Sequence, residues 1–126
     1  MDVPEHFHVS GEHVCYRPVA TVTFSQVIEL CSSAVAFCRM RNLRCLLVDT
    51  TRLTGFGSPD TLDRFEFAHR CAQAADGAVK VAFLARPEMI DPDRFGLAVA
   101  RNRGFWTGIF ASESEALQWL IDPNSP

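Results

Sequence analysis

Lysine is almost missing from this chain of 126 residues, in which the single lysine, Lys80, stands beside eleven arginines. The formal net charge of −3 gives no excess of positive charge of the kind that binds nucleic acid. No apolar run approaches the roughly 20 residues that span a bilayer, and the acidic, polar N-terminus lacks the pattern of an export signal. We therefore expect a cytoplasmic protein with no nucleic-acid partner and no integral membrane association.

The cysteines also lack the spacing of a metal or redox motif. No CxxC pair is present, and the five cysteines lie among apolar residues, at positions 15, 31, 38, 45 and 71. This predicts reduced thiols in a hydrophobic core. His6, His8 and His13 would share one hairpin, but no carboxylate or thiolate stands at ligand spacing beside them. We predict no metal site and no cofactor.

Apolar runs and helix-start signals alternate along the whole chain. The predicted strands are 7–10, 13–17, 44–50, 78–85 and 105–111, and the predicted helices begin near positions 24, 59, 92 and 113. A hairpin followed by repeated helix-strand units calls for a mixed sheet with right-handed crossovers. The sequence thus predicts one α/β domain over 1–126, with about five strands, about four helices and frayed ends at 1–5 and 122–126.

The second helix has a clear start signal and an apolar stripe. Ser58 is predicted as its N-cap, with Pro59 at the first helical position. The stripe through Leu62 and Phe65 is predicted to face the core. Phe67 lies about 200° around the helix from Phe65, so Phe67 is a candidate exposed aromatic side chain, for a partner surface or for an apolar pocket under the preceding connector.

Four segments, read in order, carry a family resemblance. They are the strand end 46–49, the strand 80–84, the helix end 99–104 and the closing stretch 110–120. Together they resemble the SpoIIAA-like branch of STAS-type domains over nearly the whole chain. The resemblance implies a small α/β sandwich that binds protein partners in a regulatory role, with relatives that carry lipid-binding modules.

Some members of that wider family are switched by phosphorylation of a serine at the start of the helix after the central strand. Ser58 matches that serine by its place and is the candidate phosphoacceptor. Gly57 stands where the family has an acidic residue, and Asp60 and Asp63 would repel a phosphate.

The end of the central strand is the place where we expect a site. Asp49 ends a strand predicted to be buried on both faces, and the ends of such strands form the ligand-binding edge of open α/β sheets. Leu53 and Phe56 put apolar side chains into the following connector, like a lid. The candidate ligand-binding or partner-binding residues are Asp49, Thr51, Leu53, Phe56, Ser58 and Phe67.

Three functions remain open from the sequence. The first is a non-enzymatic regulatory module that binds a protein partner, or a second copy of itself as a homodimer, through this edge. The second is a carrier or sensor of a small apolar or acyl ligand. The third is an enzyme that uses Asp49 and His69. Arg86, Arg94 and two more arginines gather around the third helix, where they answer the helix dipole or bind an anion.

Overall fold

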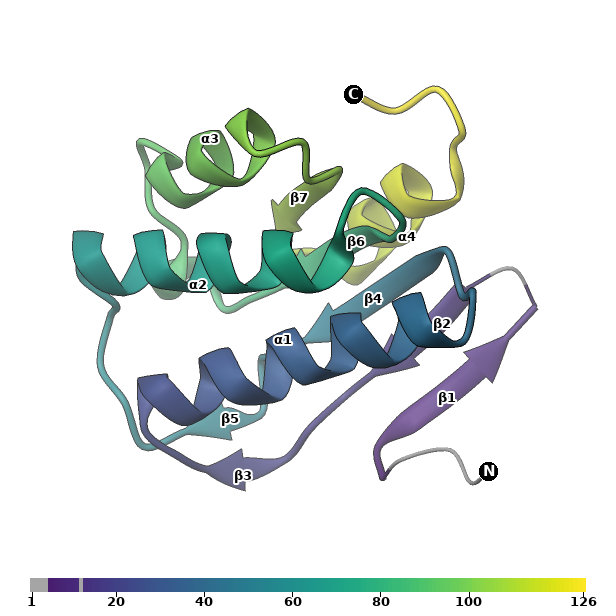
Figure 1. Cartoon of the computed structure of the whole chain (residues 1–126). Helices are drawn as coiled ribbons and strands as arrows, with labels where there is room; N and C mark the ends of the chain where they lie inside the picture. The colour runs from purple at the N-terminus through teal and green to yellow at the C-terminus, as the bar shows by residue number, and fades with distance from the viewer. Residues whose placement is uncertain (1–4, 12) are drawn as a thin grey trace.

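The central feature of the protein is a five-stranded sheet, seen in a computed structural model that describes residues 5–11 and 13–126 (Figure 1). The strands are β1 (Phe7–Ser10), β2 (His13–Tyr16), β4 (Cys45–Asp49), β6 (Lys80–Leu84) and β7 (Thr107–Phe110), in the order β1-β2-β4-β6-β7. β1 is antiparallel to β2, and every other neighbouring pair is parallel. The predicted mixed sheet is confirmed.

Helices cover both faces of this sheet. Helices α1 (Phe24–Met40), α2 (Thr61–Ala75) and α3 (Phe95–Asn102) share one face, and α4 (Glu113–Ile121) lies behind the sheet in Figure 1. Side chains alternate between the faces, so that Leu46 and Val48 contact the first group of helices while Leu47 contacts α4. This explains why β4 has a continuous apolar sequence. None of the helices in the described part of the chain has the length and hydrophobicity needed to cross a membrane.

The start of α2 differs from the prediction. The N-cap is Asp60, whose Oδ1 accepts the N–H of Asp63 at 2.8 Å, while Oδ2 of Asp63 accepts the N–H of Asp60 at 3.2 Å. This reciprocal capping box satisfies two backbone N–H groups that a helix start leaves unpaired. The prediction that Ser58 is the N-cap is wrong, because Ser58 lies exposed in the loop before the helix.

The rotation of α2 also differs from the prediction. Phe67 points inward, with its ring 5.2 Å from that of Phe83, and Ala68 and Cys71 are buried on the same side. Leu62 and Phe65, predicted to be buried, are 73% and 38% exposed. Apolar residues on α2 are spread around the helix, so the contacts with α1, α3 and the sheet decide which of them are buried.

A second, two-stranded sheet holds the connectors beside the central strand. β3 (Ala20–Thr21) pairs in parallel with β5 (Leu53–Thr54), and Leu53 is fully buried. Gly55 follows with φ of +101°, and a Cβ there would lie 2.8 Å from the carbonyl oxygen of Val22. The predicted lid-like connector is therefore held in place at Leu53. The sequence pattern did not predict this sheet, because each of its strands has only two residues.

The start of α3 lies later than predicted. The segment before it contains the short 3-10 helix η1 (Pro87–Met89), and α3 begins at Phe95 rather than near position 92. Oδ2 of Asp91 accepts the N–H of Phe95 at 3.0 Å, and Oδ1 accepts the N–H of Asp93 at 3.1 Å. Asp91 thus caps the helix as a start signal should, but across a longer turn.

The C-terminal tail is ordered by side-chain contacts, so the prediction of a frayed end at 122–126 is wrong. Nε1 of Trp106 donates to the carbonyl of Ser125 at 3.2 Å, and Nε1 of Trp119 donates to the carbonyl of Pro126 at 3.1 Å. Beneath the tail, Nζ of Lys80 donates to the carbonyl of Asp122 at 2.8 Å and lies 4.2 Å from the Trp106 ring centroid. Of the N-terminal segment predicted to fray, residues 1–4 lie outside the described part of the chain.

Candidate functional site

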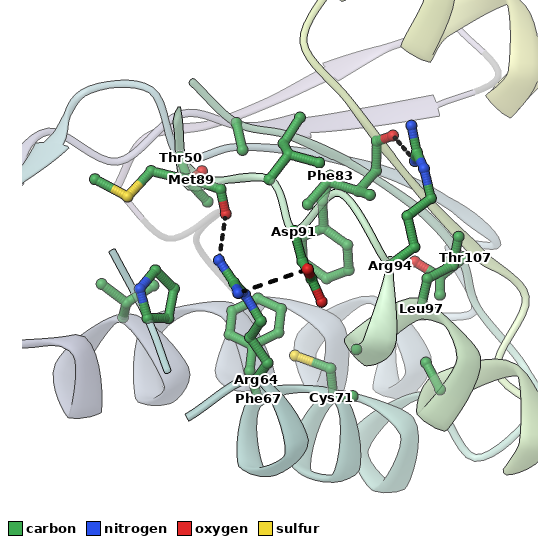
Figure 2. Close-up of a pocket in the computed structure, with 18 of the residues that line it drawn as sticks. Thr50, Arg64, Phe67, Cys71, Phe83, Met89, Asp91, Arg94, Leu97 and Thr107 are labelled. Carbon is green, nitrogen blue, oxygen red and sulfur yellow. Dashed lines mark hydrogen bonds and ion pairs between the residues drawn. The ribbon is translucent and has the colours of Figure 1, made fainter. Parts of the chain in front are cut away.

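An apolar cavity of about 130 Å³ lies between α1, α2, α3 and strands β6 and β7 (Figure 2). The segment that contains η1 and the connector before α2 complete its wall. The cavity is partly open to solvent, and its surface is mostly apolar. A buried apolar void of about 150 Å³ is large enough to take up benzene. The cavity is thus of the size of a small apolar group.

Phenylalanine rings form much of the cavity wall. The ring of Phe67 has its centroid 6.0 Å from that of Phe24 and 5.2 Å from that of Phe83. The ring centroids of Phe56 and Phe24 lie 5.7 Å apart. Those of Phe83 and Phe105 lie 6.5 Å apart, in an edge-to-face arrangement. Such ring pairs hold one another in place, so the wall is preformed rather than assembled around a ligand.

The thiol of Cys71 also faces the cavity and behaves as an apolar group there. Cys71 is fully buried, and burial raises the pKa of its thiol well above the usual value. The thiol is therefore neutral at physiological pH. All five cysteines are free thiols, which agrees with the predicted reduced state.

Charged groups line the cavity on the side of α2 and the η1 segment. Nη2 of Arg64 donates to the carbonyl of Met89 at 3.2 Å, and Nη1 of Arg64 lies 4.0 Å from Oδ1 of Asp91, as the dashed lines in Figure 2 show. The N–H groups of Phe95 and then Asp93 hold the pKa of Asp91 below its usual value, and Arg64 adds to this. Arg64 and Asp91 thus form an ion pair that joins α2 to the start of α3.

Two further arginines lie on the cavity wall. Nη2 of Arg86 donates to the carbonyl of Leu53 at 3.4 Å, and Nη1 of Arg94 donates to the carbonyl of Ile109 at 3.3 Å. Each guanidinium group is thus attached to a backbone carbonyl that holds it in position. The sequence drew attention to both arginines, but the other members of that group, Arg101 and Arg103, do not line the cavity.

Asp49 lies in a separate ion-pair network at the carboxyl end of β4. Nη1 of Arg17 donates to Oδ2 of Asp49 at 3.0 Å and to Oε1 of Glu113 at 2.6 Å. Oδ1 of Asp49 accepts the hydroxyl and the N–H of Thr51 at 2.6 and 3.0 Å. Burial raises the pKa of Asp49, but the Thr51 bonds and Arg17 outweigh it and keep that pKa low. A carboxylate held in this way is a poor base.

His69 takes no part in the ion-pair network around Asp49. Its ring stacks on Phe65 with centroids 6.0 Å apart, and its Nδ1 is buried with no hydrogen-bond partner among the described residues. Neither Asp49 nor His69 lines the cavity, so the cavity does not bring the two together.

No metal-binding group is assembled in the described residues. No three His, Cys, Asp or Glu side chains in 5–11 and 13–126 are placed to share an ion. His6, His8 and His13 therefore do not form a set with a fourth ligand there.

The six predicted binding residues divide among four places. Phe56 and Phe67 line the cavity, whereas Asp49 and Thr51 belong to the ion-pair network. Leu53 is buried under β3, and Ser58 is exposed. Sequence reasoning missed Arg64 and Asp91 as cavity residues, because a lone arginine inside a helix and an aspartate in a turn carry no signal of a shared wall.

Comparison with known proteins finds similarity among solved structures. No family model and no curated protein matches this chain. A solved structure from Shewanella loihica is described as an uncharacterized protein of the DUF3478 family with a SpoIIAA-like fold. It is similar to this chain at 18% sequence identity and a TM-score of 0.46, over 96% of this chain and 99% of that one. The description of that structure names the same kind of fold as the sequence resemblance.

Proposed function

We propose that this domain binds a small apolar ligand in the cavity between α1, α2 and α3. The observation that supports the proposal is the cavity itself, which has a preformed aromatic wall and a few charged groups, as small-molecule sites usually do. Its volume of about 130 Å³ limits the apolar part of the ligand to about six carbon atoms. In this proposal the domain is a carrier or sensor and performs no chemistry on the ligand.

The position of the cavity also supports binding. It lies at the edge of the sheet where β6 ends, beside Thr50, the residue that follows β4. The carboxyl ends of parallel strands are the usual ligand side of an open α/β sheet. The sequence placed the candidate site at this strand end, with an apolar ligand between the connector and the helices, and the cavity supports the same location in this proposal.

A direct test is to fill the cavity and measure binding of benzene. We expect benzene to shift the amide NMR signals of cavity residues in the unmodified protein. In Ala100→Leu, a larger side chain at a buried cavity position takes up the space and the shifts disappear. Ala98→Leu is the matched control, since Ala98 lies exposed on the same helix and does not line the cavity.

The proposal fails if benzene causes no shifts in the unmodified protein, or if Ala100→Leu and Ala98→Leu retain the same response. Should Ala100→Leu fail to fold, Leu97→Phe repeats the test at a partly exposed position of the wall. A far-ultraviolet circular dichroism spectrum identifies the folded variants before binding is compared.

A protein-binding regulatory role is the second candidate. Leu62 and Phe65 on α2, with Phe95 at the start of α3, are exposed apolar side chains of the kind that partner surfaces use. Ser58 is also exposed and so accessible to a kinase. Sedimentation of the protein with and without Leu62→Lys tests self-association, and a monomer at every concentration would contradict the homodimer.

A further inference from the structure

The charge around the cavity is opposite in sign to that of the whole chain. Three arginines, Arg64, Arg86 and Arg94, line the cavity together with one carboxylate, that of Asp91. The protein as a whole has a formal net charge of −3. The charged residues that line this cavity therefore carry a net positive charge, whereas the protein as a whole is acidic.

Two of the three arginines remain without a carboxylate in the cavity wall. Asp91 lies 4.0 Å from Nη1 of Arg64, and both of its oxygens accept backbone N–H groups at the start of α3. That pair is balanced and holds the wall together. Arg94 has a carbonyl as its partner, and Arg86 has a carbonyl and the largely exposed Glu88, at 3.8 Å and outside the cavity.

Arg86 and Arg94 flank the carboxyl end of β6 from two sides. Arg86 is attached to Leu53 in β5, and Arg94 is attached to Ile109 in β7, the neighbour of β6 in the sheet. A guanidinium group carries five N–H donors, and each of these backbone contacts uses one of them. The remaining donors of both groups are available to an anionic oxygen.

We infer that the ligand is a small organic acid, with an apolar body in the cavity and an anionic head group at Arg86 and Arg94. The inference rests on the proposed function and adds the charge of the ligand to it. A free acid fits better than a lipid, because the cavity of about 130 Å³ is too small for a long acyl chain. Carboxylate and phosphate heads share the chemistry that the guanidinium groups recognise.

The test compares two ligands of the same shape and different charge. Phenylacetate and phenylacetamide have the same number of non-hydrogen atoms, and only the first is ionised at pH 7. We expect calorimetric or NMR titration to show phenylacetate bound at least about tenfold more tightly, because charge-assisted hydrogen bonds are the stronger ones. The ratio should shrink as salt is raised, since part of the attraction is screened.

Variants locate the head group. Arg86→Gln combined with Arg94→Gln should remove the preference for phenylacetate over phenylacetamide, because glutamine removes the positive charge and keeps an N–H donor for the backbone carbonyl. Arg44→Gln is the matched control. Arg44 is exposed and precedes β4, at the opposite end of the strands from the cavity, so the same loss of charge there should change neither affinity.

The results separate this inference from the proposed function. Equal affinity of the unmodified protein for the acid and the amide overturns the inference while benzene binding still supports the cavity as a site. Loss of preference in Arg44→Gln would also overturn it. Co-sedimentation with phosphatidylglycerol vesicles, without binding of free phenylacetate, would show a lipid head group as the source of the anion and contradict the free acid. Failure of all three small probes refutes both proposals.

Discussion

On one face of the sheet α1, α2 and α3 meet around a cavity, whereas on the other face the single helix α4 packs directly onto the strands. The packed face is tight at Gly108, where a Cβ would lie 2.9 Å from the ring of Phe110. It is sealed at one end by Lys80, which is 4% exposed beneath the C-terminal tail. The face covered by three helices has the larger core, but packing there leaves a cavity. That cavity is the place where a ligand fits.

Deletion of core volume should distinguish the two faces most strongly. Leu120→Ala removes a fully buried side chain of α4 and should lower the free energy of unfolding by about 3 kcal/mol, because the tight surroundings cannot close the space. Leu97→Ala, at the partly exposed cavity wall, should cost about 1 kcal/mol. Urea denaturation measures both values. Equal losses would show that the two faces are packed alike.

The ion-pair network at Asp49 joins the central strand to α4 on the packed face, because Arg17 binds both Asp49 at the end of β4 and Glu113 at the start of α4. Asp49→Asn should cost about 2 kcal/mol at pH 7, since Arg17 loses a buried partner. The folded state lowers the pKa of Asp49 below its unfolded value of about 4. The stabilisation is therefore complete above about pH 5, begins to shrink as the unfolded state takes up a proton, and is lost as pH falls through the folded pKa.

Urea denaturation of the wild type and Asp49→Asn between pH 7 and pH 2 measures this effect. The difference between the two proteins should stay constant down to about pH 5 and then shrink. A difference that does not depend on pH would mean that the charge of Asp49 contributes nothing.

Adding one methyl group at a glycine on each face gives a matched pair. Gly108→Ala should destabilise the protein by about 1 to 2 kcal/mol, because the ring of Phe110 is held against Trp119 and cannot move freely. Gly96→Ala should stabilise it by up to about 1 kcal/mol, since the new Cβ would meet the Arg64 carbonyl oxygen at an ordinary 3.5 Å and alanine favours the helix. Thermal unfolding compares them, and effects of the same sign would contradict the comparison.

The smallest effect concerns the start of α2, which borders the cavity face. Asp60→Ala removes the side-chain cap and should cost about 1 kcal/mol, whereas Ser58→Ala should change stability by less than about 0.5 kcal/mol. Both variants can be measured in the same denaturation series. A larger loss of stability in Ser58→Ala than in Asp60→Ala would show that Ser58 caps the helix.

The sequence predicted only some of the residues of the candidate site. Phe56 and Phe67 were both predicted as binding residues and both line the cavity, although Phe67 was expected to be more exposed than it is. The arginines near α3 were noticed, but nothing local separates Arg94, on the cavity wall, from Arg101, which donates to the Thr107 carbonyl at 3.3 Å. Which of several similar side chains share a wall depends on contacts between residues far apart in the chain.

The sequence by itself determined the four α-helices and the strands of the five-stranded sheet, because the signals for each of them lie within a few residues of one another. The capping box at Thr23 and the continuous apolar run of β4 are examples, and both are present in the structure. Tertiary structure alone decided the rotation of α2, the pairing of β3 with β5, and the docking of the tail over Lys80. Each of these rests on contacts between residues far apart in the chain, such as Ala20 with Leu53 and Lys80 with Asp122, which local propensity does not encode. The cavity and its arginines belong to this second group.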